Sequence, residues 1–163
     1  MEVALVSDTH IPSRAQRIPD AFRRRIRAAD HVIHAGDFDS ESAFADVREL
    51  AGGLTAVSGN VDPRIGLPGV ASVELDGVEF VATHGTGSRR GYESRVVTTV
   101  RGAAETNSPV GVSGHTHEVL DEVVDGVRLL NPGSATGAAP ASRTTMMTAS
   151  VAGGEFDVTV HEI

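Results

Sequence analysis

The sequence predicts an α/β fold in a single domain, residues 1–163. The first half alternates short apolar runs with amphipathic segments, the pattern of strand-helix units that build a parallel sheet. The second half carries two hairpin signals, Asp76-Gly77 and Asp125-Gly126, between alternating runs. A length of 163 residues fits one domain that buries roughly two thirds of the surface exposed by its unfolded chain.

The first half contains three strands and two helices in series. Pro19 suits the first turn of a helix, Ser40 suits an N-cap, and Gly52-Gly53 ends a helix. The expected strands are Glu2–Val6, 31–35 and 54–57, and the expected helices are 18–29 and 41–51. Right-handed crossovers between parallel strands then bring the carboxyl ends of the three strands side by side.

The second half is expected to be richer in hairpins. One hairpin turns at Asp76-Gly77, and a helix then precedes a buried strand. The elements are strands 71–75 and 78–83, helix 92–106, strand 110–113, and antiparallel strands 119–124, 127–130, 144–151 and 156–161. We find no internal repeat and no boundary to a second domain.

The amino-acid composition indicates the cellular compartment of the protein and limits which side chains can bind metal. The chain has no cysteine, which fits a reducing cytoplasm and excludes thiolate metal sites and cysteine nucleophiles. The N-terminus has no basic segment typical of a signal peptide, and no apolar run approaches membrane-spanning length. We therefore expect a cytoplasmic protein that has no membrane partner and binds metals through His, Asp, Glu and Asn.

The net charge and the type of basic residue indicate which partners the protein disfavours and the kind of organism from which it comes. The net charge is −8, and all 14 basic residues are arginine. An acidic surface disfavours nucleic acid backbones as partners. The lysine-free composition resembles cytosolic proteins of salt-adapted archaea, and we favour a halophilic archaeon as the source. The alternative is a GC-rich genome that favours arginine codons.

Seven metal-binding side chains follow predicted strands. The stretch Ser113-Gly-His-Thr-His117 comes after a buried strand. If its backbone stays extended, His115 and His117 point to the same side, which suits two neighbouring metal ions. Five other oxygen or imidazole donors also come just after strands: Asp8, His10, Asp37, Asn60 and His84.

These donors indicate a particular chemistry. Carboxylate, imidazole and amide oxygen suit manganese, iron, zinc, nickel or cobalt, and the absence of sulfur argues against copper(I) and iron-sulfur clusters. Two ions roughly 3.5 to 4 Å apart would activate a bridging water and hold both oxygens of an in-line displacement at phosphorus. Asp37, in the middle of the set, is the expected bridge, giving one oxygen to each metal.

Other polar residues receive more ordinary interpretations. His34 is expected to be structural or to support a ligand, and His31 and His161 to have no special role. Arg64, Arg89 and Arg90 lie in loops after site motifs, where a guanidinium could hold phosphate, although solvated surface arginines are the favoured interpretation. Tyr92, Met146 and Met147 are expected to pack. The Gly- and Arg-rich segment 85–92 is a candidate mobile substrate loop.

Five short motifs occur together in a fixed order. They are Asp8-Thr-His10, Gly36-Asp37, Gly59-Asn60, His84-Gly85 and Gly114-His-Thr-His117. In this order they resemble the motifs of the calcineurin-like metallophosphoesterases, and the resemblance spans positions 3 to 134, including Asn131-Pro-Gly-Ser134. The compact length is similar to the small YfcE-like phosphodiesterase branch of bacteria and archaea.

The resemblance implies a four-layer αββα sandwich of two mixed β-sheets flanked by helices. It implies one metal bound by Asp8, His10, Asp37 and His117, and another bound by Asp37, Asn60, His84 and His115. Manganese is the favoured ion for both sites. Asp37, Asn60 and His84 are then the expected catalytic residues. The implied reaction is hydrolysis of a small phosphodiester, with in-line attack by a hydroxide that bridges the metals.

One position departs from the family pattern. Many members have a histidine after the Gly-Asn of the third motif, whereas this chain has Val61, which cannot donate a proton to a leaving group. We therefore expect a preference for diesters with good leaving groups, such as aryl phosphodiesters, or the recruitment of another acid. Asp62 either holds a ligating imidazole in its working tautomer or caps the turn before Pro63.

Two alternatives to the enzyme stay open. The retromer subunit Vps29 resembles this branch and works mainly as an interaction surface, so a non-catalytic metal-binding scaffold is the first. A purely structural metal protein is the second. Exposed edge strands are also compatible with a homodimer.

Overall fold

The computed structural model describes residues 1–163, and its first sheet contains the amino-terminal strands. The strand order is β10-β9-β1-β2-β3. The bounds are β1 Glu2–Val6, β2 His31–His34, β3 Leu54–Ala56, β9 Thr145–Ala152 and β10 Glu155–Glu162. As predicted, β1, β2 and β3 are parallel. The carboxy-terminal hairpin joins the same sheet, because β9 pairs antiparallel with β1.

The second sheet has the order β4-β5-β6-β8-β7. Its strands are β4 Val70–Leu75, β5 Val78–Thr83, β6 Val110–Val112, β7 Val119–Val124 and β8 Val127–Pro132. The β4–β5 and β7–β8 pairs are hairpins, and β5, β6 and β8 run parallel. Asp76, Gly77, Asp125 and Gly126 all have positive φ, as the predicted tight turns require. Both sheets are therefore mixed.

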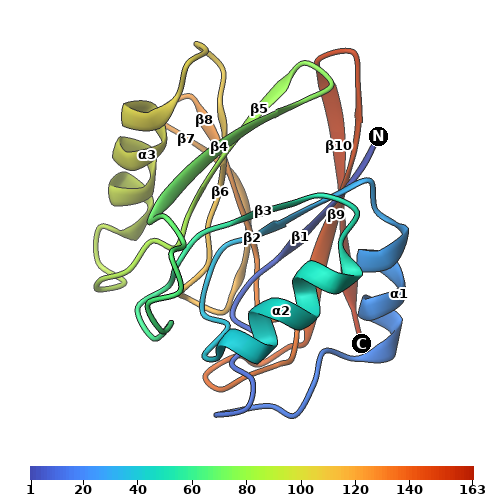
Figure 1. Ribbon diagram of the computed structural model, residues 1–163. Coiled ribbons are helices and arrows are strands. Elements are labelled where there is room, and N and C mark those ends of the chain that lie inside the picture. The colour runs from blue at the N-terminus through green and yellow to red at the C-terminus, as the bar shows by residue number, and fades with distance from the viewer.

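Helices cover the outer face of each sheet (Figure 1). Helices α1 (Asp20–Ala28) and α2 (Glu41–Leu50) lie against the first sheet, and α3 (Tyr92–Ala103) lies against the second. Three separate apolar cores result: one between the sheets, one under α1 and α2, and one under α3. The four-layer αββα prediction is confirmed.

A local signal explains the start of α2, whereas the end of α3 depends on a distant residue. Ser40 caps α2, since its hydroxyl accepts a hydrogen bond of 3.1 Å from the backbone N–H of Ala43. The predicted helix 92–106 ends earlier, at Ala103. Buried Glu79 accepts backbone hydrogen bonds from Glu105 and Thr106, which holds these residues outside the helix. That contact comes from another strand and has no local sequence signal.

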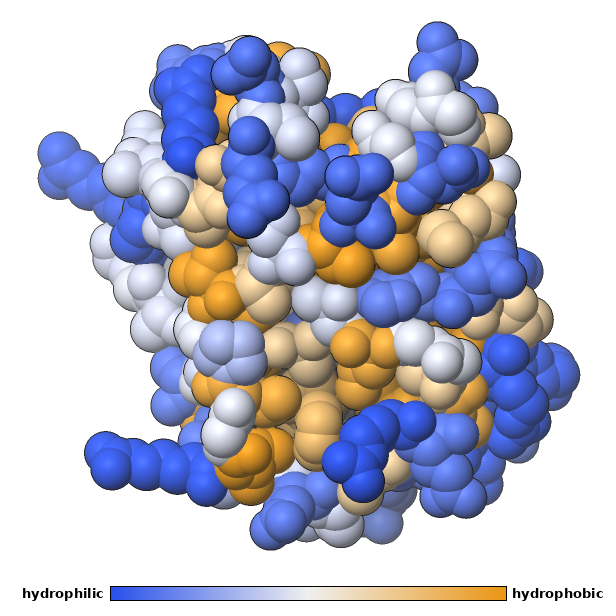
Figure 2. Space-filling view, turned by 45° about the horizontal axis from the view of Figure 1, so that its top comes forward, coloured by the Kyte–Doolittle hydropathy of each residue, from blue (hydrophilic) through white to orange (hydrophobic).

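The loops that follow β1, β2, β3 and β5 gather at the lower end of the sheets in Figure 1. This is the arrangement expected where parallel strands end together. On the face that Figure 2 presents, hydrophobic residues collect toward the middle and hydrophilic side chains lie around the margin. None of the three helices combines the length and hydrophobicity needed to cross a bilayer.

Candidate metal centre

An unusual backbone conformation marks the strand-end loops. Eight non-glycine residues have positive φ, and the six of these outside the two hairpin turns are Asp8, His10, Asp37, Asp39, His115 and His117. A side chain in this left-handed region costs of order 1 kcal/mol or more, and such residues cluster at functional sites. The fold therefore holds these residues in a strained backbone conformation, which orients their carboxylates and imidazoles.

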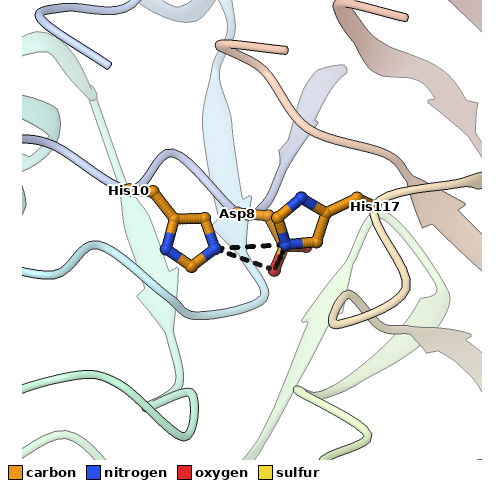
Figure 3. A group of neighbouring side chains, drawn as sticks. All are labelled: Asp8, His10 and His117. Atoms are coloured by element: carbon orange, nitrogen blue, oxygen red, sulfur yellow. Dashed lines mark hydrogen bonds and ion pairs between the residues drawn. The ribbon is translucent and has the colours of Figure 1, made fainter. Parts of the chain in front are cut away.

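The first ligand group contains Asp8, His10 and His117 (Figure 3). The Nε2 atoms of the two histidines are 3.1 Å apart, and their rings are stacked. Oδ1 of Asp8 lies 3.3 Å from Nε2 of His117 and 3.8 Å from Nε2 of His10. All three side chains are buried, so their polar atoms face one another rather than water.

The second group contains Asp37, His84 and His115. Oδ2 of Asp37 lies 3.0 Å from Nε2 of His84. Oδ1 of Asn60 joins the group, 3.1 Å from Nε2 of His84 and 3.1 Å from Nδ1 of His115. Asn60 itself is exposed, which leaves this group more open to solvent than the first.

Asp37 connects the two groups through a single oxygen. Its Oδ2 lies 3.0 Å from Nε2 of His84 and 3.6 Å from Nε2 of His10. Its Oδ1 accepts a hydrogen bond of 3.1 Å from the backbone N–H of Val61. The central position of Asp37 between the two groups fits its predicted role as a bridge, and how its two oxygens would divide between two metals stays a prediction.

In each histidine of the two groups, one ring nitrogen faces the other members of the site. The other ring nitrogen donates a hydrogen bond that fixes the orientation of the ring. Nδ1 of His10 donates to Oδ1 of Asp39 at 2.8 Å. Nδ1 of His84 donates to the carbonyl of Ala35 at 2.7 Å. In the same way, Nδ1 of His117 donates to the carbonyl of Ala138 and Nε2 of His115 to that of Gly87. In the neutral ring the remaining nitrogen is then a bare acceptor.

These tautomers leave a cluster of acceptors facing one another. The lone pairs of His10 and His117 meet at 3.1 Å, and those of His84 and His115 both meet Asn60 Oδ1. Carboxylate oxygens of Asp8 and Asp37 lie among them. Acceptors this close require a cation or shared protons between them. The donor set, nitrogen and oxygen without sulfur, fits borderline divalent metal ions.

The acidic surroundings also shift proton affinity. Burial disfavours charge on His84 and His10, but nearby carboxylates outweigh it, chiefly Asp37 for the former and Asp8 for the latter, so both pKa values are raised. Burial opposes ionisation of Asp37, yet the hydrogen bond that His84 donates to it when its ring is protonated outweighs burial and lowers the pKa of Asp37. Burial lowers the pKa of His117. Metal ions bind in place of such protons.

The loop Gly114–His117 is not extended, which corrects the expectation that His115 and His117 point to one side. Both residues have positive φ, and they reach different ligand groups. A Cβ on Gly114 would lie only 2.7 Å from Oδ2 of Asp8. This close approach of the backbone, rather than a two-residue period, sets the direction of the two imidazoles.

Asp62 accepts hydrogen bonds from backbone N–H groups and does not hold a ligating imidazole. Its Oδ2 accepts hydrogen bonds from the N–H groups of Asp37 and Gly59, at 2.8 and 2.7 Å. Its Oδ1 accepts from Phe38 and Asp39, at 2.7 and 3.0 Å. Its hydrogen bonds go to no imidazole. Asp62 instead ties the loop after β2 to the loop after β3.

Two buried side chains hold the loop Gly114–His117 in place through hydrogen bonds. The hydroxyl of Tyr92 donates to the carbonyl of Gly114 at 2.6 Å, and the amide of Asn131 donates to the same carbonyl at 2.9 Å. Tyr92 thus packs, as expected, and also supports the site. His34 is structural: it stacks on Phe38, and burial lowers its pKa to about 3.

The remaining candidates lie outside the ligand groups. His31 and His161 bond to Thr55 and Thr148 on neighbouring strands, and Met146 and Met147 are buried. Arg89 pairs with Glu118 at 2.8 Å, whereas Arg64 and Arg90 are exposed. Sequence reasoning missed Asp39 and the Gly87 carbonyl. The carboxylate two residues after Asp37 was a usable signal for the first, but nothing in the sequence indicates the second.

Comparison with known proteins agrees with the geometry. The model of the Calcineurin-like phosphoesterase superfamily domain matches residues 1–154. The chain belongs to this superfamily. A probable metallophosphoesterase of Methanothermobacter thermautotrophicus is 33% identical over 138 residues, which cover 83% of this chain and 78% of the relative. The family resemblance found in the sequence is confirmed.

Two further proteins are similar to this chain, one in sequence and one in structure. A phosphodiesterase of Methanocaldococcus jannaschii is 27% identical over 153 residues, covering 84% of this chain and 86% of the relative. The crystal structure of Vps29 from Entamoeba histolytica in complex with zinc superposes with a TM-score of 0.79 at 24% identity, covering 100% of this chain and 98% of that one. The chain therefore shares its fold with this Vps29.

Proposed function

We propose that this superfamily member is a phosphodiesterase that uses two divalent metal ions to hydrolyse a small phosphodiester. The observation that carries the proposal is the pair of ligand groups joined by Oδ2 of Asp37, in which acceptor atoms face one another without donors. The phosphodiesterase name of the Methanocaldococcus jannaschii relative supports the substrate class. Manganese is the first metal to test, and nickel, zinc, iron and cobalt suit the same donors.

The chain's own residues would divide the work as follows. Asp8, His10 and His117 would hold one ion, and Asn60, His84 and His115 the other, with Asp37 shared. Bound ions supply Lewis acidity: they lower the pKa of water so that it can attack phosphorus, and they neutralise charge on the phosphoryl oxygens. Asp39 and the carbonyls of Ala35, Ala138 and Gly87 keep the imidazoles in the tautomers that ligation needs.

Val61 determines which esters react well. Its side chain is 41% exposed at the edge of the site and supplies no proton. A leaving group would then have to depart as a stable anion, as a p-nitrophenolate does. We therefore expect aryl phosphodiesters to react faster than esters of simple alcohols.

A non-catalytic scaffold is the second candidate. The match to Vps29 of Entamoeba histolytica favours it, and that structure contains zinc. Both candidates predict metal binding, so metal binding alone does not separate them. The same applies to a purely structural metal site, which would add unfolding on chelation. A cytoplasmic location, a homodimer and a halophilic source stay predictions that these candidates share.

The deciding experiment is hydrolysis by metal-stripped protein in high salt. Bis-p-nitrophenyl phosphate and p-nitrophenyl phosphate are compared after adding manganese, nickel, zinc or magnesium singly. The proposal predicts turnover that returns with metal, favours the diester and is lost in Asp37→Asn. Folded protein that binds two equivalents of metal without hydrolysing either ester would contradict it and favour the scaffold.

A further inference from the structure

A cavity lined mainly by small and polar residues opens beside the candidate metal centre. It has a volume of about 420 Å³ and lies between the loop after β3, the end of β5 and the first half of α3. His84 lines it, and Gly59, which precedes Asn60, lines it too. A molecule bound at the metal centre can therefore extend into this cavity.

Arg95 is the one permanently charged residue in the lining, and it has no carboxylate partner. Five other arginines in the chain form ion pairs: Arg17, Arg23, Arg89, Arg128 and Arg143. Arg95 instead donates through Nη2 to the carbonyls of Gly85 and Ser88, at 3.1 and 2.9 Å. Its positive charge stays uncompensated in a chain with a net charge of −8.

The guanidinium also keeps unused donors. Its Nε is the one buried side-chain nitrogen or oxygen in the chain without a hydrogen-bond partner, and Nη1 makes no hydrogen bond to the chain. Nε is closed off by the chain, but the free N–H groups of Nη1 match the oxygens of a carboxylate or phosphate. The hydroxyls of Thr83 and Thr86 also line the cavity and make no hydrogen bond within the chain. They are further donors for an oxyanion.

We propose that this cavity binds an anionic substituent of the substrate, a carboxylate or a second phosphate on an ester group of the diester, through Arg95. The proposal rests on the proposed phosphodiesterase function and adds a substrate class to it. Substrates that carry charge at both the scissile phosphate and the ester group would be preferred over diesters with neutral ester groups.

The test uses two diesters that differ in one group. They are 2-carboxyethyl p-nitrophenyl phosphate and its neutral analogue, 2-carbamoylethyl p-nitrophenyl phosphate, and both release p-nitrophenolate. Each is assayed with the metal-loaded protein at constant ionic strength, and kcat and KM are determined separately. We expect the carboxylate ester to have a kcat/KM about tenfold higher, mainly through a lower KM, as a charge-assisted hydrogen bond supplies.

Three variants connect that ratio to the cavity. Arg95→Met should bring the ratio of the two kcat/KM values close to one, and Arg95→Lys should give an intermediate ratio because it keeps charge without the planar fork. Thr83→Val tests the cavity without disturbing Arg95 and should lower the ratio by a smaller factor. Arg101→Met is the matched control, since it removes the same charge from the same helix outside the cavity.

The outcomes distinguish failure of the proposed anion site from failure of the proposed phosphodiesterase function. A ratio that falls in Arg95→Met and persists in Arg101→Met supports the anion site. Hydrolysis of bis-p-nitrophenyl phosphate with equal kcat/KM for the two test esters overturns the anion site and leaves the phosphodiesterase intact. A ratio that persists in Arg95→Met also overturns it. Absence of hydrolysis of all three esters contradicts the proposed function and this proposal together.

Discussion

Nδ1 of His10 donates a hydrogen bond of 2.8 Å to Oδ1 of Asp39. Both residues have positive φ, and the side chain of His10 is almost fully buried. Because Nδ1 is occupied in this way, Nε2 is the nitrogen available to a metal. Asp39 would therefore position a metal ligand without being one, and its carboxylate increases the basicity of the ring.

Replacing Asp39 by asparagine should weaken metal binding without unfolding the protein. We expect affinity for manganese at one of two sites to fall by about 10- to 100-fold, the usual effect of removing a hydrogen-bond partner of a ligating histidine. Titration calorimetry on stripped protein measures it. Asp46→Asn, which makes the same charge change at the Arg23 ion pair, is the control. Equal affinities in the Asp39 variant and the wild type would refute the assigned role.

A histidine at position 61 should broaden the range of leaving groups. Val61 is 41% exposed, so the larger ring can be accommodated there. General acid catalysis contributes about 100-fold or more to departure of a poor leaving group. Val61→His is therefore expected to raise kcat for an alkyl diester such as methyl p-nitrobenzyl phosphate more than for bis-p-nitrophenyl phosphate. Val61→Gln, polar but not an acid, is the control, and equal gains in both variants would argue against proton donation.

Buried Glu79 should make stability depend on pH. Burial opposes its ionisation, but hydrogen bonds from Glu105, Thr106 and Ser72 outweigh burial and lower the pKa from 4.5 to about 2. A lowered folded-state pKa gives stability that is fully present above pH 4.5 and is lost as the pH falls toward 2. Glu79→Gln should cost about 1 to 3 kcal/mol near neutral pH.

Urea unfolding in the presence of a chelator measures that cost. The difference in free energy of unfolding between wild type and Glu79→Gln should be constant above pH 5 and shrink below pH 4.5. Glu122→Gln, at an exposed position of β7, supplies the control. A difference that does not change with pH would show that the carboxylate charge of Glu79 is not what stabilises the loop after α3.

Asp62→Asn should loosen the connection between two ligand loops. The carboxylate accepts four backbone hydrogen bonds, which an asparagine oxygen cannot replace in full. We expect a loss of about 1 to 3 kcal/mol in the metal-free protein and partial recovery when metal binds the folded state. Thermal unfolding with and without manganese tests this. An unchanged melting temperature would mean that the loops hold their positions independently of Asp62.

The sequence predicted the layers, and the residues that come together in the two groups, better than the paths of the loops. Hydrophobic periods and turn signals are local, so the strands, the Ser40 cap and the Asp76-Gly77 hairpin were predictable. The convergence of Asp8 and Asp37 follows from strand ends that lie side by side in a parallel sheet. The arrangement within the site was not predictable, because it depends on contacts between distant segments.

Three examples show the limit. The sequence predicted an extended backbone through His115. In the structure His115 has positive φ, and the neighbouring Gly114 packs closely against the loop after β1. The support that Gly87 gives to His115 comes from a carbonyl, which every residue carries. The end of α3 is set by Glu79, which lies on another element. None of these contacts has a pattern in the local sequence.

The most direct test of the two-metal account is a titration of catalysis with metal. Manganese is added stepwise to stripped protein at a concentration well above the dissociation constants, and hydrolysis of bis-p-nitrophenyl phosphate is followed at each step. The account predicts that the rate rises to a plateau at two equivalents, and that Asp37→Asn shows no comparable rise. A plateau at one equivalent, or no turnover from folded protein that has bound two, would contradict it.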